Sequence, residues 1–237
     1  MSTFRLRITT GSGLERESEA SASTQVVDAA RAGVPELLEQ EPVASPEALK
    51  LSSRLQALAA ENDRFILVAG FNEKESSAEI AMQLAAGLSE INGQSVLLVD
   101  GDLRNPWLHN RFGIDVQPGL TNVLGKGAGL LTSAIRVITP TLAVLPAGNS
   151  RPDSSLFAST DFSDLLECQL RPRFRFIILN SAPFSQFVDA SLIASRADGV
   201  VITLTSGRHS RTGLLDLKNE LESLKAKIFG TVLCEAS

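Results

Sequence analysis

Six short hydrophobic runs recur from residue 64 onward, each separated from the next by a more polar stretch. The runs are FILVAG, SVLLVDGD, LAVLPAG, FRFIILNSA, GVVITLTS and IFGTVL. They are mostly continuous rather than alternating, which is typical of strands that are buried on both faces of a parallel sheet. Because helical stretches lie between them, the sequence predicts a doubly wound α/β fold, with a mostly parallel sheet and helices on both faces.

The intervening stretches carry apolar residues at helical spacing. Helices are expected over 78–91, 161–170, 189–196 and 210–226. In the last of these, we expect one leucine stripe to face the core: Leu214, Leu217, Leu221 and Leu224. A further helix is predicted from Ser45-Pro46-Glu47 to about residue 60, because Ser caps free N–H groups, Pro suits the first helical position and Glu favours the positive end of the helix dipole.

Residues 1–45 are expected to be an extension or linker before a domain at 46–237. Residues 11–45 are rich in Ser, Glu and Ala and show little apolar periodicity, apart from one short helix candidate at 26–31. Phe4, Leu6 and Ile8 alternate with polar residues. This pattern fits a short strand that docks on the domain or on a partner, and it fits a partly ordered tail equally well.

Composition narrows the class of protein. The chain of 237 residues is 43% hydrophobic, but no apolar run approaches the roughly 18 residues that cross a bilayer, and the first residues lack the apolar segment of a signal peptide. The net charge of −5 argues against a nucleic-acid partner. Cys168 and Cys234 have no metal or redox spacing. We therefore expect a cytoplasmic protein that does not span a membrane.

The stretch VLLVDGDLRNPWLHNRFGIDVQPGLTNVLGKG resembles a segment of the bacterial tyrosine kinases of capsule and exopolysaccharide synthesis, which are partitioning-type P-loop ATPases. The matching residues are Asp100, Asp102, Leu103, Arg104, Pro106, Leu108, His109, Phe112, Gly113, Pro118, Gly119 and Leu120. SPEALKLSSRLQAL, LAVLPAG, FVDASLIASRADGVVITLTSG and IFGTVLCE resemble further family segments, so that the resemblance covers 45–237. It implies a P-loop NTPase-like fold.

The loop GFNEKESS departs from the family's Gly-Glu-Gly-Lys-Ser/Thr, in which glycines let the backbone wrap around phosphates and a lysine neutralises them. An ungapped alignment places Ser77 at the lysine, and a shift by one residue places Ser76 there. Lys74 is the only nearby cation, and Glu73 and Glu75 flank it. The candidate, degenerate nucleotide loop therefore comprises Gly70, Asn72, Lys74, Ser76 and Ser77.

Two further nucleotide positions differ from the family pattern. Asn180 replaces an acidic residue that helps to hold Mg²⁺, and Cys234 replaces an asparagine on the adenine side. Asp100 and Asp102 match the family. They are candidates for a catalytic or weak Mg²⁺-binding pair, or for residues of the fold alone, with Asp100 capping a turn.

The resemblance also implies features that this chain lacks. Family kinases carry a C-terminal tyrosine cluster, whereas this sequence contains no tyrosine. The family's oligomerisation helix reads Glu-x-x-Arg-x-x-Arg, whereas Glu47, Lys50 and Ser53 stand here, with Arg54 one place late. Ring assembly of the family type is therefore not expected.

We expect a non-catalytic relative without a cofactor that acts through protein contacts in capsule or exopolysaccharide synthesis or export. Its expected partner is a membrane polysaccharide co-polymerase (a chain-length regulator) or an active kinase paralogue, which would hold it at the inner face of the cytoplasmic membrane. The alternative is an active kinase or ATPase, in which Lys74 reaches the phosphates of ATP and Asp100 or Asp102 holds Mg²⁺. A third hypothesis is a localisation ATPase. The sequence argues against it, because we find neither a basic surface signal nor an amphipathic membrane helix.

Overall fold

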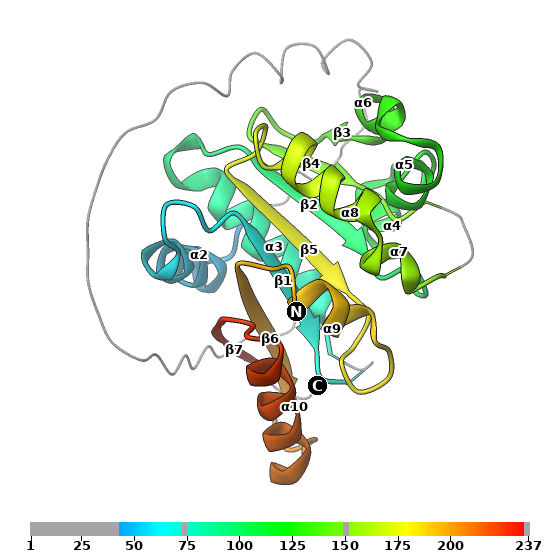
Figure 1. Cartoon of the computed structure of the whole chain (residues 1–237). Helices are drawn as coiled ribbons and strands as arrows, with labels where there is room; N and C mark the ends of the chain where they lie inside the picture. Colours follow the sequence, from blue (N-terminus) through cyan, green and yellow to red (C-terminus); the bar gives the residue numbers. More distant parts are fainter. Residues whose placement is uncertain (1–42, 73–74, 149–151, 235–237) are drawn as a thin grey trace.

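A seven-stranded sheet forms the centre of the computed structural model, which describes residues 43–72, 75–148 and 152–234 (Figure 1). Its strands are β1 (Phe65–Gly70), β2 (Val96–Gly101), β3 (Arg136–Val137), β4 (Leu142–Leu145), β5 (Phe176–Ser181), β6 (Gly199–Thr205) and β7 (Ile228–Cys234). Their order is β3-β4-β2-β5-β1-β6-β7, and every neighbouring pair is parallel except β3 with β4. The predicted fold class is confirmed.

Helices cover both faces of this sheet (Figure 1). The α-helices are α2 (Pro46–Leu58), α3 (Ser77–Glu90), α4 (Leu108–Phe112), α5 (Leu120–Lys126), α6 (Leu131–Ala134), α7 (Ser155–Ala158), α8 (Thr160–Asp164), α9 (Asp189–Ala194) and α10 (Arg211–Ser223). The described residues also form two short 3₁₀ turns, η2 (Ile91–Gly93) and η3 (Ala128–Leu130), and a π-helix, η4 (Leu165–Leu170). The helix predicted over 161–170 is thus divided between α8 and η4, where Arg171 N–H donates to the carbonyl of Leu166.

The strand cores explain why the hydrophobic runs are continuous. In β1, Phe65, Leu67 and Ala69 pack into one core layer, and Ile66 and Val68 pack into the layer on the other face. All six residues of β1 are buried, as are those of β2 and β5. A strand covered on both faces by helices cannot alternate between apolar and polar residues, which is the physical basis of the sequence prediction.

The start of α2 follows the predicted chemistry. Ser45 Oγ accepts a hydrogen bond from Ala48 N at 3.1 Å, and Pro46 occupies the first helical position. Leu51 and Leu55 are buried against the layer that contains α3, so that this helix belongs to the domain. The proposed strand at Phe4–Ile8 and the proposed helix at 26–31 lie outside the described residues.

The leucine stripe of α10 is only half buried, which corrects the prediction that all four residues face the core. Leu217 and Leu221 are buried, whereas Leu214 and Leu224 are partly exposed. The helix lies beside β6 and β7, where the sheet ends (Figure 1). Only the middle turns of the helix, with Leu217 and Leu221, therefore pack against the hydrophobic core. The two-residue strand β3 was not predicted, because two residues show no periodicity.

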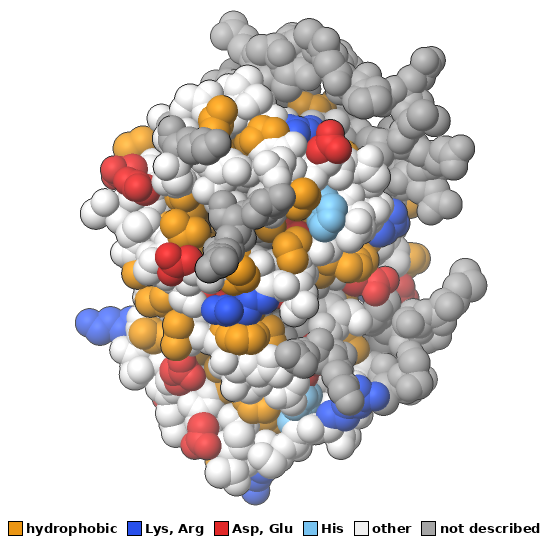
Figure 2. Space-filling model, turned by 90° about the vertical axis from the view of Figure 1, so that its right-hand side faces the viewer, with side chains coloured by type: hydrophobic (Ala, Val, Ile, Leu, Met, Phe, Trp, Pro, Cys, Tyr) orange, Lys and Arg blue, Asp and Glu red, His pale blue; other side chains and the backbone are white. Residues whose placement is uncertain are grey.

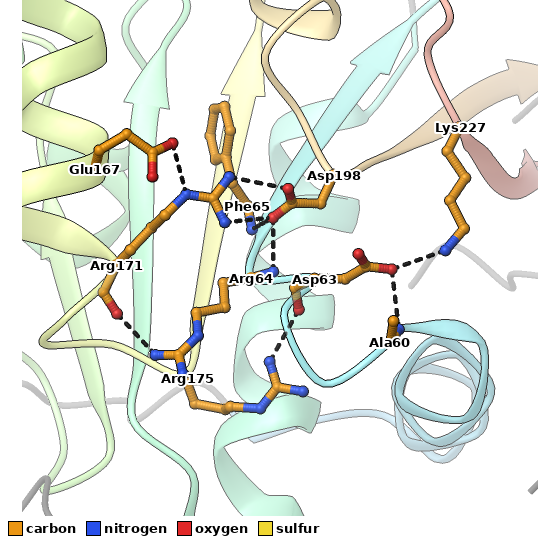
Figure 3. Close-up of polar contacts among 9 residues, drawn as sticks. All are labelled: Ala60, Asp63, Arg64, Phe65, Glu167, Arg171, Arg175, Asp198 and Lys227. Carbon is orange, nitrogen blue, oxygen red and sulfur yellow. Dashed lines mark hydrogen bonds and ion pairs between the residues drawn. The ribbon is translucent and has the colours of Figure 1, made fainter.

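A carboxylate joins the amino ends of β1 and β6 to the end of η4 (Figure 3). Asp198, which precedes β6, accepts hydrogen bonds from the backbone N–H groups of Arg64 and Phe65, both at 2.8 Å. It also receives two bonds from the Arg171 guanidinium, at 2.7 and 2.9 Å. This clamp lies at the end of the sheet opposite to the carboxyl ends of the strands, where the predicted site residues are found. None of the described helices is long and apolar enough to cross a bilayer.

Candidate functional site

The sheet brings several predicted site residues to one edge. Asp100 near the end of β2 is the register partner of Asn180 on β5, and Gly70 at the end of β1 is the partner of Thr203 on β6. Parallel strands place their carboxyl ends together, and open α/β sheets bind ligands at that edge. The sequence-predicted residues Gly70, Asp100 and Asn180 therefore lie on the same rim of the molecule.

Glu75, which the sequence shows only as a neighbour of Lys74, turns its side chain into the loop. Its Oε2 accepts hydrogen bonds from the backbone N–H groups of Phe71 and of Asn72, the latter at 3.2 Å. A Cβ atom added at Gly70 would lie 2.8 Å from Oε2, so the carboxylate rests against the bare backbone of that glycine. Only 7% of Glu75 is exposed. Both N–H groups are thus engaged within the chain itself, and that of Phe71 also donates to the carbonyl of Thr203 at 3.2 Å.

His209 completes this cluster from a distant part of the chain. Its Nε2 lies 2.6 Å from Glu75 Oε1 and accepts a hydrogen bond from the backbone N–H of Thr205 at 3.1 Å, and its Nδ1 lies 3.2 Å from Asn72 Nδ2. The ring also meets the ring of Phe71 edge to face, at 5.2 Å between centroids. Sequence analysis missed this role because His209 has no ligand spacing; the available signal was its place in a polar loop directly after a strand.

Burial disfavours the charged form of both partners. It raises the pKa of Glu75 to about 7, although the backbone N–H groups of Asn72, Phe71 and Thr205 act in the opposite direction. Burial also lowers the pKa of His209, and the charge of Arg208 adds to this effect. Both shifts favour the neutral carboxyl group and the neutral imidazole.

The Asp100 side chain caps the amino end of α4. Its Oδ2 accepts hydrogen bonds from the backbone N–H groups of Trp107 at 2.9 Å and Leu108 at 3.0 Å. Burial raises the pKa of Asp100 to about 6, while these two bonds, and the side chain of Asn180, lower it. The carboxylate thus has the turn-capping contacts that the sequence offered as the alternative to a catalytic role.

Asp102 closes the following turn. Its Oδ1 accepts hydrogen bonds from the backbone N–H groups of Arg104 at 3.1 Å and Asn105 at 3.0 Å. The Arg104 guanidinium turns away to pair with Asp189 at 3.2 Å and to stack over the ring of Phe187. Within the described part of the chain, no group of three or more His, Cys, Asp or Glu residues is arranged to hold a metal ion.

Three further predicted residues, Ser76, Ser77 and Cys234, lie around the Glu75 cluster. Ser76 is exposed and precedes α3 without a side-chain capping bond, and Ser77 N donates to the carbonyl of Glu75 at 2.7 Å. Cys234, at the end of β7, is buried; burial, with the negative charges of Glu75 and Glu79, raises the pKa of its thiol to about 11. Lys74 lies outside the described residues.

Comparison with known proteins finds similar sequences among bacterial kinases. The chain is 31% identical over 181 residues to the tyrosine-protein kinase ptk of Acinetobacter johnsonii, covering 75% of this chain and 24% of that protein. It is 29% identical over 185 residues to the tyrosine-protein kinase CpsD of Streptococcus agalactiae, covering 77% and 80%. It is 30% identical to the succinoglycan biosynthesis transport protein ExoP of Rhizobium meliloti, covering 75% and 23%. The chain thus spans about a quarter of ptk and of ExoP.

Solved structures agree with these sequences. The chimerical protein CapA2B2 superimposes with a TM-score of 0.72 at 26% identity, covering 80% of this chain and 84% of that one. The VpsO kinase domain superimposes with a TM-score of 0.71 at 26% identity, covering 81% and 94%. No protein-family model matches the chain. The chain is therefore a homologue of the bacterial tyrosine kinases of capsule and exopolysaccharide synthesis, and its fold is that of their P-loop kinase domains.

Proposed function

We propose that this chain is a non-catalytic relative of the polysaccharide tyrosine kinases and acts through contacts with other proteins. The observation that supports this proposal most strongly is the inward position of Glu75, whose carboxylate takes up the N–H groups of Phe71 and Asn72. Backbone N–H groups of this kind are the donors that hold phosphates in a phosphate loop. A phosphate would have to displace the Glu75 carboxyl group from these donors in order to bind to them.

The other described residues do not fit a magnesium-bound nucleoside triphosphate. Asn180 provides no charge where the family has an acidic residue, and Asp100 Oδ2 is engaged by two backbone N–H groups. The loop contains no lysine at the family position, where Ser76 or Ser77 stands. Losing the attraction of that lysine removes a few kcal/mol, against the roughly 5–8 kcal/mol of millimolar to micromolar nucleotide binding.

The partner that we propose is a membrane polysaccharide co-polymerase or an active kinase of the same family. The names of the relatives support it, since ExoP is a succinoglycan biosynthesis transport protein and CpsD and ptk are tyrosine kinases. On the face shown in Figure 2, acidic, basic and hydrophobic side chains are interspersed, rather than gathered into one basic patch. This face therefore carries no basic patch of the kind that a nucleic-acid partner would need. We place the protein in the cytoplasm, at the membrane when its partner holds it there.

Isothermal titration with Mg-ATP tests the loss of the nucleotide site. We expect no saturable binding, with an active kinase domain of the family as the positive control. Saturation with a Kd below about 100 μM, equivalent to roughly 5.5 kcal/mol, would overturn the proposal.

An ATPase assay decides the alternative of an unorthodox active site. Wild type, Lys74→Ala and Asp100→Ala are compared at equal concentration. Equal rates at background level are expected, because neither residue then supports turnover. A rate in the wild type that both substitutions abolish would favour the active enzyme instead.

A further inference from the structure

Two half-buried arginine side chains lie together at the amino end of the sheet, away from the candidate functional site. Arg64 directly precedes β1 and Arg175 directly precedes β5, and these two strands are neighbours in the sheet (Figure 3). Arg64 Nη1 donates to the carbonyl of Arg171 at 2.8 Å, and Arg175 Nη1 donates to the carbonyl of Asp63 at 2.9 Å. Each guanidinium is therefore held by a backbone oxygen, which carries no net charge.

The carboxylates next to this pair are engaged by other groups. Asp198 belongs to the clamp described above, and Asp63 Oδ2 is bound by Lys227 Nζ at 2.8 Å. Among the described residues, neither Arg64 nor Arg175 forms an ion pair with a carboxylate. The two positive charges thus stand side by side without a counter-charge in direct contact.

This arrangement has an electrostatic cost for the chain. Burial lowers the pKa of Arg175, and the positive charge of Arg64 lowers it further. The carboxylates of Asp63 and Glu61 act in the opposite direction, with a smaller effect. The guanidinium is also fixed in place, since the Cζ atom of Arg175 lies 4.3 Å from the centre of the Phe176 ring. An anion that bound between the two guanidiniums would remove their repulsion.

We propose that Arg64 and Arg175 bind a phosphate dianion, either free or carried by a phosphorylated side chain of a partner. A guanidinium presents its N–H groups as a planar fork that matches two phosphate oxygens. Each guanidinium has five N–H donors. In the part of the chain that the structure describes, no nitrogen of either group is both buried and without a partner, so the donors beyond Nη1 reach solvent.

The charge of the ligand follows from the charge of the site. A phosphate group carries about two negative charges near neutral pH and can neutralise both guanidiniums, whereas a carboxylate neutralises only one. This site lies at the opposite end of the sheet from the phosphate loop. It is therefore independent of the proposed function and of whether the chain is catalytic.

NMR titration with inorganic phosphate tests the site through the Nε–Hε signals of Arg64 and Arg175. At about pH 7.5 and constant ionic strength, we expect both signals to shift and to saturate with a Kd of about 1 mM or tighter. Sodium chloride in place of phosphate should produce no saturable shift. A failure to saturate below about 10 mM phosphate, or an equal response to chloride, would overturn the site.

Substitution of each arginine separates this site from a general attraction of charge. Arg64→Gln and Arg175→Gln each remove one positive charge but keep an N–H group that can donate to a backbone carbonyl, and each should weaken phosphate binding at least tenfold. Arg173→Gln is the matched control, because Arg173 lies in the same segment before β5 but donates to Gln169 Oε1 at 3.0 Å. It should leave the Kd within about twofold. Equal weakening in all three variants would contradict the proposal.

A conservative variant keeps the test decisive if a glutamine variant does not fold. Arg64→Lys retains the charge but loses the planar fork, so we expect phosphate binding at least threefold weaker than in the wild type; unchanged binding would count against the fork. A parallel titration with O-phosphoserine identifies the source of the phosphate. Tighter binding than that of inorganic phosphate would support a phosphorylated side chain, and equal or weaker saturable binding would support the free ion.

Discussion

Replacing Asp198 by Ala removes the acceptor that joins the amino ends of β1 and β6 (Figure 3). The backbone N–H groups of Arg64 and Phe65 lose their side-chain acceptor, and Arg171 loses the partner that it binds through two nitrogens. The side chains of Arg171 and Asp198 are only 17% and 20% exposed. Removing one partner of a buried pair costs about 3–5 kcal/mol, and the remaining exposure places our expectation near 3 kcal/mol of unfolding free energy.

The pH dependence of this loss has a definite sign. Burial by itself raises the pKa of Asp198, but the hydrogen bonds from Arg171, Phe65 and Arg64 together outweigh it and lower the pKa below its ordinary value. A carboxylate with a lowered pKa contributes stability above the pKa of the unfolded chain, about 3.9, and loses it as the pH falls through the folded pKa. The difference between wild type and Asp198→Asn should therefore shrink below about pH 4.

Urea denaturation followed by far-UV circular dichroism measures both effects, at pH 7 and at pH 3. Lys227→Met is the control, because Lys227 forms a more exposed pair with Asp63 and should contribute less than about 1 kcal/mol. A loss below 1 kcal/mol in Asp198→Ala, or a difference for Asp198→Asn that stays constant to pH 3, would refute this account of the clamp.

Three further predictions concern the core and the rim. In Gly199→Ala, the new Cβ would overlap the ring of Phe229, so we expect a loss of about 1–3 kcal/mol in urea denaturation; unchanged stability would contradict this packing. Leu221→Ala should cost about 2–5 kcal/mol and Leu215→Ala less than about 0.5 kcal/mol, since only the first is buried, and equal losses would be incompatible with the observed face of α10. The pKa of Asp100 is raised to about 6, so the folded state binds this proton more tightly than the unfolded state does. The wild type therefore loses stability as the pH rises from about 4 to 7 and the carboxyl group ionises. Asp100→Asn should therefore gain roughly 3 kcal/mol relative to wild type over that range, and a difference independent of pH would count against the buried carboxyl.

Much of the fold was predictable because its signals are local. A run such as FILVAG is apolar at every position, and a strand with that pattern must be covered on both faces. The start of α2 was also readable, since Ser45 and Pro46 satisfy the helix terminus with their own atoms. By contrast, the π-helix Leu165–Leu170 and the edge strand β3 depend on how neighbouring elements pack, and the sequence does not indicate them.

The candidate site was predictable in its position and less so in its contacts. The motif around Asp100 and the altered loop from Gly70 to Ser77 located the rim of the sheet that the structure assembles. The direction of Glu75 was open in the sequence, because a loop carboxylate can face solvent or the backbone. Its partner His209 was not recognised, since 137 residues separate it from Asn72, which it also contacts.

By itself, the sequence determined the α/β class, the resemblance to the polysaccharide tyrosine kinases and the absence of a lysine at the family position of the phosphate loop, because each follows from residue types in order along the chain. Only the tertiary structure decided that Glu75 turns inward and meets His209, and that Asp100 caps α4. Those outcomes depend on the distances between strand ends and on burial, which alters the pKa of each group. Neither quantity is defined until the parallel sheet has brought its carboxyl ends together.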